Sequence, residues 1–354
     1  MDLEALYYRV KETVSTLDLE AVWPGFKPLK FALFDNEKCF FDGRYIEKTN
    51  EFCANTSILY KGEQIATWMV QGELEIPVLA SKLVHEMFHG FQDQRGWDCW
   101  PNELEALYRY EYEAENLAFK LRENELLLAL LEGFDGTLFC ELLSLRKKRS
   151  EEFPYQFSYE TETEEIEGTA HFVEWQVLKQ LDERKSSELV SNMREVLTAP
   201  ERMFPVRISC YYSGALMINA MLGAGKYGFE PETRPVLLPL LKNAEPYAGE
   251  FPGREAALLK ASEATQSFGG QTDSIIDSAL EKNEVVLRGP VELGFVNIYN
   301  ARCRRGFITT TYFMMYRENG EEKMLPGDFV IKMRDERTVE TVYRWERAPE
   351  ASGI

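Results

Sequence analysis

Two of the three histidines in this 354-residue chain frame a glutamate, in the run His85-Glu86-Met87-Phe88-His89. Residues four apart lie on one face of a helix, about 6 Å apart along its axis, so both imidazoles can bind one zinc ion. Glu86 would lie beside that face, where a carboxylate can accept a proton from water. The run therefore predicts a helical zinc site with Glu86 as general base.

A catalytic zinc ion needs a third protein ligand and leaves its fourth position to water. Glu167 is the best candidate, because small residues follow it (Gly168-Thr169-Ala170) and would let its helix approach the histidine helix closely. His171 shares that face, where it would orient a ligand, hydrogen-bond the transition state or serve as the third ligand itself. Rival third ligands lie between the two motifs, at Glu103, Glu105, Glu111 and Glu113.

These motifs together resemble the gluzincin superfamily of zinc metallopeptidases, which includes the thermolysin and aminopeptidase N types. The matching residues are His85-Glu86-x-x-His89 and Glu167-Gly168-x-x-x-Phe172-Val173-Glu174, with Phe172 where the aminopeptidase branch has Tyr. Tyr211-Tyr212-Ser213-Gly214 resembles the Y-x-x-G helix start of the same branch. The resemblance implies Zn²⁺ held by His85, His89 and Glu167, hydrolysis of peptide bonds by an activated water, and Tyr211, with His171 as a further donor, stabilising the oxyanion.

The resemblance also implies a substrate-binding edge strand just before the histidine helix. The β-rich stretch 64–70 occupies that position, and Ala66, Thr67 and Trp68 would bind the substrate backbone by strand addition. Two features depart from the family. The stretch between His89 and Glu167 is much longer than in thermolysin and aminopeptidase N types, and the G-x-M-E-N signature that captures a substrate amine in aminopeptidases is absent.

Two other functions remain open at this point. A catalytically silent, zinc-stabilised peptide-binding protein would be favoured by a fourth protein ligand, such as His171, in the water position. A carboxylate-rich iron protein on a helical body would need two Glu-x-x-His motifs, and the sequence contains only one, Glu86-Met87-Phe88-His89.

Hydrophobic periodicity places the histidine motif on a helix that Pro77 opens and that ends near Gln94. An N-terminal helix at 3–16 and short strands at 29–34, 56–60 and 64–70 precede it, and the strands are expected to form a small, mostly antiparallel sheet. Asn102 and Glu105 form a capping box that would start a long helix. The helices expected after it span 102–131, 137–149, 162–183, 187–198, 211–222, 254–264 and 273–283.

The pattern turns to strands after residue 284, with a hairpin signal at Asn319-Gly320. We therefore predict an α+β protein. A zincin-like catalytic domain (1–284, with a helix and small sheet at 1–75 and a helical body at 76–284) would precede a small all-β domain at 285–354. The polar stretch 158–165 is expected to lie before a helix, and the basic run 146–149 to be a solvated helix end.

Composition excludes several classes of function. There are 40 Lys and Arg against 59 Asp and Glu, a formal charge of −19, which argues against nucleic-acid and anionic-membrane partners. No apolar run is long enough to span a membrane, and the first residues do not resemble a signal peptide. Six scattered cysteines without a CxxC pair indicate reduced thiols. The expected compartment is the cytoplasm and the expected partner a peptide or protein substrate.

Overall fold

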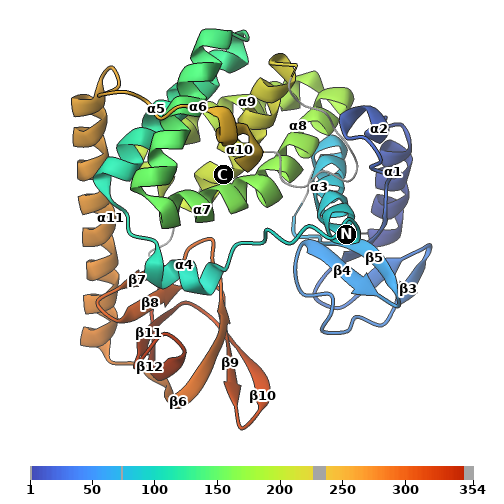
Figure 1. Ribbon diagram of the computed structural model, residues 1–354. Helices are drawn as coiled ribbons and strands as arrows, with labels where there is room; N and C mark the ends of the chain where they lie inside the picture. The colour runs from blue at the N-terminus through green and yellow to red at the C-terminus, as the bar shows by residue number, and fades with distance from the viewer. Residues whose placement is uncertain (1, 73–74, 226–236, 347–354) are drawn as a thin grey trace.

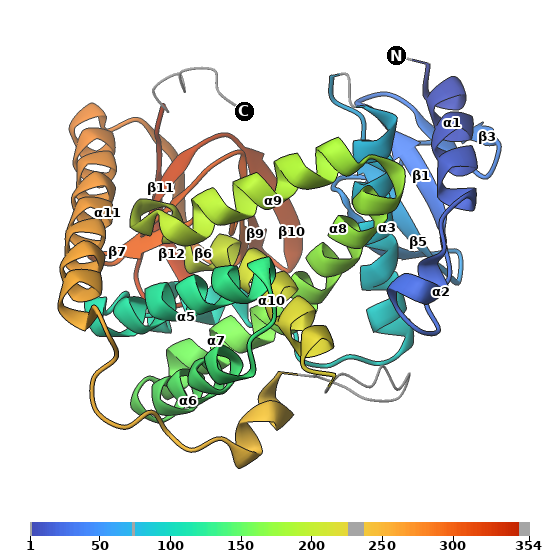
Figure 2. The same cartoon turned by 90° about the horizontal axis from the view of Figure 1, so that it is seen from above.

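The computed structural model describes residues 2–72, 75–225 and 237–346, and it is an α+β protein as expected. Two sheets lie apart, one built from the N-terminal part of the chain and one from the C-terminal part, and the helices of the middle of the chain connect them (Figures 1 and 2). Residues 347–354 of the expected β-domain lie outside the described residues. No helix in the described part of the chain is long and apolar enough to cross a membrane.

The N-terminal sheet contains five strands in the order β3-β2-β1-β5-β4, and only the β1–β5 pair is parallel. The strands are β1 (Lys30–Phe34), β2 (Cys39–Phe41), β3 (Arg44–Ile46), β4 (Thr56–Tyr60) and β5 (Glu63–Met69). The expected mostly antiparallel sheet is thus confirmed, with β2 and β3 added. The expectation that the strand at 64–70 is an edge strand is wrong, because β5 is hydrogen-bonded to β1 on one side and β4 on the other.

Helix α1 (Leu3–Ser15) packs beside this sheet, followed by the short α2 (Leu19–Val22). Helix α3 (Ile76–Gln94) carries the histidine motif and lies directly against the sheet. A Cβ atom at Gly90 of α3 would lie 2.5 Å from Leu29 Cδ1 and 2.7 Å from Ser57 Oγ, so the glycine permits this close approach. Packing against the sheet and against a later helix, α8 (Thr169–Leu181), buries the apolar residues of α3 and fixes the direction in which its histidines point.

The helical body follows α3. Its elements are α4 (Glu103–Arg109), α5 (Ala114–Glu132), α6 (Gly136–Glu152), α7 (Pro154–Thr163), the π-helical turn η1 (Glu164–Gly168), α8 (Thr169–Leu181), α9 (Glu183–Thr198), η2 (Pro200–Met203), α10 (Val206–Gly223), η3 (Leu238–Asn243) and α11 (Arg254–Lys282).

Two helix predictions in this body are wrong. The single helix expected at 102–131 is interrupted after α4, which Asn102 caps as expected. The chain is extended at Tyr110, so alternate side chains point to one side: the rings of Tyr110 and Tyr112 lie 4.9 Å apart, and the Tyr110 hydroxyl donates to Glu160 at 2.6 Å. Conversely, the two helices expected at 254–264 and 273–283 are one continuous helix, α11.

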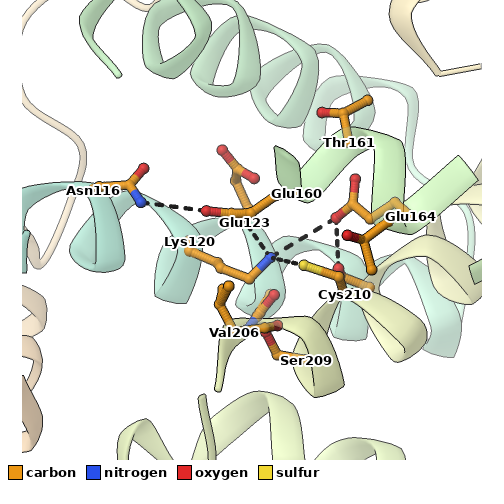
Figure 3. A network of polar contacts seen from close by, with 12 residues as sticks. Asn116, Lys120, Glu123, Glu160, Thr161, Glu164, Val206, Ser209 and Cys210 are labelled. Atoms are coloured by element: carbon orange, nitrogen blue, oxygen red, sulfur yellow. Dashed lines mark hydrogen bonds and ion pairs between the residues drawn. The ribbon is translucent and has the colours of Figure 1, made fainter. Parts of the chain in front are cut away.

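A buried ionic network joins α5, α6 and α7, and Figure 3 shows the part of it around Lys120. Arg149 pairs with Glu160 at 2.7 Å, and Lys120 contacts the same carboxylate at 2.9 Å. Arg146 pairs with Glu164 at 2.5 Å. The basic run is therefore not a solvated helix end, and the stretch 158–165 is helical rather than a polar lead-in, because its glutamates neutralise buried cations.

The C-terminal sheet is antiparallel, with seven strands in the order β10-β9-β6-β12-β11-β8-β7. Asn319 and Gly320 form the β9–β10 turn with positive φ values, which confirms the hairpin. The sheet packs its own apolar core and contacts α4 and α11. Its strands are β6 (Val285–Val296), β7 (Arg302–Arg304), β8 (Phe307–Thr310), β9 (Phe313–Glu318), β10 (Glu321–Pro326), β11 (Phe329–Met333) and β12 (Thr338–Arg344).

Candidate metal centre and active site

Helix α3 points His85 and His89 at one carboxylate of the π-helical turn. Their Nε2 atoms lie 3.0 Å apart, and Glu167 Oε2 lies 3.7 Å from the first and 3.5 Å from the second. Tetrahedral zinc with bonds of about 2.0–2.1 Å separates its ligand atoms by about 3.3 Å, so the three atoms fit such a site. All three residues are buried, and a proton or a metal ion between them would relieve the repulsion of three electron-pair donors this close together.

Glu167 reaches this position because of local backbone geometry. A π-helical turn is wider than an α-helical one, so residues three apart diverge further around its axis. Glu164 therefore faces Arg146 and Ser213, whereas Glu167 faces the histidines. The small residue after Glu167 serves a different contact from the one expected: a Cβ at Gly168 would lie 2.6 Å from Gly214 Cα, so the close approach is to α10 and not to α3.

Arg207, in the first turn of α10, holds the other oxygen of Glu167. Its Nη2 donates to Glu167 Oε1 at 2.6 Å, and its Nε donates to the Tyr211 hydroxyl at 2.6 Å. Its Nη1 pairs with Glu103. Glu103, a rival third ligand in the sequence, is thus separated from the histidines by Arg207, whose charge it neutralises. The sequence analysis missed Arg207, although its i,i+4 spacing to Tyr211 is a detectable signal.

Gln92, one turn after His89, is a second residue that the sequence analysis missed. Its Nε2 donates to the Ile166 carbonyl and to Thr169 Oγ1, both at 2.9 Å. Its Oε1 must therefore accept from His89 Nδ1, 2.7 Å away. A proton on Nδ1 leaves the lone pair on Nε2 of His89 available for a metal ion.

Glu174, also on α8, lies behind His85 and His171. Its Oε2 is 3.2 Å from His85 Nδ1 and 3.4 Å from His171 Nδ1, although neither contact has well-aligned hydrogen-bond geometry. Lys82 pairs with its other oxygen at 3.4 Å. A carboxylate behind a histidine ligand raises the basicity of the ring and limits its rotation.

Burial and neighbouring charge shift the pKa values of the site. Burial opposes a charge on His85, but the carboxylates of Glu167 and Glu174 outweigh it and raise its pKa to about 10. Burial, together with Glu167 and Glu174, raises the pKa of Glu86 despite the opposing histidines, which is the direction that favours proton uptake by this carboxylate. Burial and the adjacent His85 lower the pKa of His171 to about 3, so its ring is neutral.

A cavity of about 500 Å³ opens beside the centre. Glu86, His171 and Tyr211 line it together with His85 and Glu167. The rings of His171 and Tyr211 stack with their centroids 4.9 Å apart. Tyr211 lies in the second turn of α10 rather than at its start, and burial raises the pKa of its hydroxyl, so it is a protonated donor.

The expected substrate strand is only partly at this cavity. Trp68 lines it, but Ala66 and Thr67 are fully buried and cannot pair with a substrate. The reason is that β5 is an interior strand and that the loop after β3 covers its end. The Thr67 hydroxyl donates to the Ala54 carbonyl at 2.9 Å, and the Met69 N–H donates to Asn55 Oδ1 at 2.7 Å.

The C-terminal part of the chain contributes Tyr299, from the loop between β6 and β7, to the same cavity. Its hydroxyl is hydrogen-bonded to Tyr211, and the two rings lie edge to face with centroids 6.4 Å apart. The sequence does not indicate that a single tyrosine in so distant a loop lies near the histidine motif. The cavity is thus assembled from α3, the π-helical turn, α8, α10 and this loop.

No protein-family model, curated protein or solved structure matches this chain. Its resemblance to the gluzincins therefore rests on the sequence motifs alone.

Proposed function

We propose that this chain is a zinc-dependent peptidase with a zincin-like body, and that His85, His89 and Glu167 hold the metal ion. The observation that supports this most strongly is the convergence of three donor atoms at 3.0–3.7 Å beside a cavity that Glu86 also lines. The substrate is a peptide or protein. The six cysteines are all free thiols, which supports a cytoplasmic protein.

The surrounding residues suit hydrolysis of an amide. Bound zinc would supply a Lewis acid and lower the pKa of water in the cavity. Glu86 accepts a proton from the attacking water and returns it to the leaving amine. Tyr211 and the neutral His171 are the donors available to a carbonyl oxygen as it becomes negative. Gln92 and Arg207 keep His89 and Glu167 in their binding orientations.

The test measures zinc content and peptide hydrolysis in the same preparations. We expect one zinc per wild-type chain. Glu86→Gln should retain the metal and lose hydrolysis of a fluorogenic peptide library, whereas Glu167→Ala should lose or weaken zinc binding. Glu125→Gln, on the exposed side of α5, is the matched control and should behave as wild type. A chain that binds no divalent metal after reconstitution with zinc would overturn the proposal.

One observation favours the second candidate, a catalytically silent zinc-stabilised binding protein. Ligand atoms of His85, Glu167 and His171 lie within 4.8 Å of one another, so His171 is placed to become a fourth protein ligand. A closed set of four protein ligands is typical of a structural site. His171→Phe separates the two functions: its zinc affinity, measured by chelator competition, should equal that of wild type in a peptidase and should fall in a structural site.

A further inference from the structure

A second cavity, of about 350 Å³, lies where the helical body meets the C-terminal sheet. Its walls come from α4, the start of α10, α11 and β7, and Figure 1 shows α4 and α11 beside the sheet at this point. The lining is mixed, and its apolar part includes Ala106, Leu107, Val206 and Phe268. Ligand sites in proteins commonly have this size and character and commonly form where two structural units meet.

Two hydroxyl groups on the wall have no hydrogen-bond partner among the described residues. They are Tyr108 OH on α4 and Thr265 Oγ1 on α11, and both atoms are shielded from bulk water. A threonine in a helix usually satisfies its hydroxyl with the carbonyl four residues earlier, as Thr272 does in the same helix at 2.8 Å. A buried unsatisfied hydroxyl is unfavourable, and a ligand that reaches both groups and accepts from them would recover the lost free energy.

Arg302, on β7, supplies a cation to the same cavity. Its guanidinium lies over the Phe268 ring, 4.4 Å from the centroid, and donates to Thr272 Oγ1 at 3.3 Å. None of the ion pairs of the described residues includes Arg302, and burial lowers its pKa. The other two arginines on the wall are neutralised, Arg304 by Asp273 and Arg207 by Glu103 and Glu167.

We infer that this cavity is a binding site for a small monocarboxylate with an aromatic or branched apolar body. The guanidinium of Arg302 matches a carboxylate in shape and charge, the hydroxyls of Tyr108 and Thr265 are further donors to it, and Phe268 with its apolar neighbours encloses the body of the molecule. One uncompensated cation favours a monoanion over a phosphate. Of the carboxylates on the wall, Glu103 is paired with Arg207, and Glu111 is exposed to water, which screens it.

The test uses isothermal titration of the full chain with phenylacetate, 3-phenylpropionate and 4-phenylbutyrate. The titrations are run on metal-stripped protein, so that a carboxylate cannot bind to zinc. We expect saturable binding of at least one probe and binding at least about tenfold weaker in Arg302→Met, because a charge-assisted hydrogen bond is lost. The neutral alcohol 3-phenylpropan-1-ol should bind wild type as weakly as the carboxylate probes bind Arg302→Met. Arg288→Met, an exposed arginine on β6 of the same sheet, is the matched control and should bind as wild type.

Tyr108→Phe gives a second, independent readout. Removal of an unsatisfied hydroxyl should leave the free energy of unfolding of the ligand-free chain unchanged or higher, while the affinity for the probe falls. The inference is overturned if no probe binds saturably, or if Arg302→Met binds as tightly as wild type. It is also overturned if binding is lost in Glu167→Ala and retained in Arg302→Met, because the probe would then occupy the metal centre.

Discussion

Gln92 decides which nitrogen of His89 carries the proton. Its amide group is held in one orientation by two acceptors, so its oxygen faces His89 Nδ1 and the lone pair of His89 faces Glu167. Arg207 acts in the same way on Glu167, because it occupies one carboxylate oxygen and leaves the other directed at the histidines. At the scale of single residues, the candidate metal centre therefore depends on two side chains outside the proposed ligand set.

Gln92→Met should lower zinc affinity about 10–100-fold, as loss of a partner behind a histidine ligand generally does. The variant keeps the volume of the buried side chain but frees the His89 ring to rotate and to change tautomer. Chelator competition measures the affinity, and the melting temperature checks the fold. Gln94→Met, on the exposed side of the same helix, is the control. Equal zinc affinity in the two variants would show that Gln92 does not orient His89.

Gly168 connects the packing of the π-helical turn against α10 with the position of Glu167. It lies at the end of the π-helical turn, against Gly214 of α10. Gly168→Ala should destabilise the chain by about 1–3 kcal/mol, because the two helices must separate to accommodate a methyl group. Zinc affinity should fall in the same variant, since Glu167 is the preceding residue. Gly136→Ala, at the start of α6 with no atom within 4 Å of the added Cβ, should be neutral or stabilising. Urea denaturation of both variants measures the difference.

The ionic network of α5, α6 and α7 makes stability depend on pH. Burial opposes the charge of Glu160, but Arg149 and Lys120 outweigh it and hold its pKa well below that of an ordinary glutamate. Its stabilising contribution is therefore full above the unfolded-state pKa of about 4.3 and is lost as the pH falls toward the folded-state value.

Glu160→Gln should lower the free energy of unfolding at pH 7 by about 3–5 kcal/mol, because two buried cations lose their partner. Between about pH 4 and 3, the decline of stability with falling pH should become shallower by up to about 1.4 kcal/mol per pH unit. Urea denaturation at several pH values measures both quantities, with Glu125→Gln as the exposed control. A slope identical to that of wild type would contradict the low pKa of Glu160.

Features that depend on contacts between residues close in sequence could be predicted, and features that depend on distant residues could not. His85, Glu86 and His89 belong to one helix, so their spacing alone indicates their common face. The break between α4 and α5 depends on Glu160, which is distant in sequence and draws Tyr110 out of the helix. The interior position of β5 likewise depends on its pairing with β1 and β4, which the local β pattern does not reveal.

The candidate active site combines residues from distant parts of the chain, because Tyr299 reaches it from the loop between two strands of the C-terminal sheet. Tyr299→Phe should retain zinc and lower kcat/KM about 2–10-fold, since the hydrogen bond that positions the Tyr211 hydroxyl is lost. Tyr312→Phe removes a hydroxyl from an exposed tyrosine in the turn between β8 and β9 and is the control. The assay is hydrolysis of the best peptide from the library, and an unchanged kcat/KM would show that Tyr299 only closes the cavity.

The late position of Tyr299 in the chain has a consequence for biosynthesis. The ribosome makes residues 85, 89 and 167 long before residue 299, and domains generally fold as units in the order of synthesis. A nascent chain can therefore bring its three proposed metal ligands together while the tyrosine that completes the cavity is still missing. Full activity of the proposed peptidase would then appear only after the C-terminal sheet has folded against the helical body.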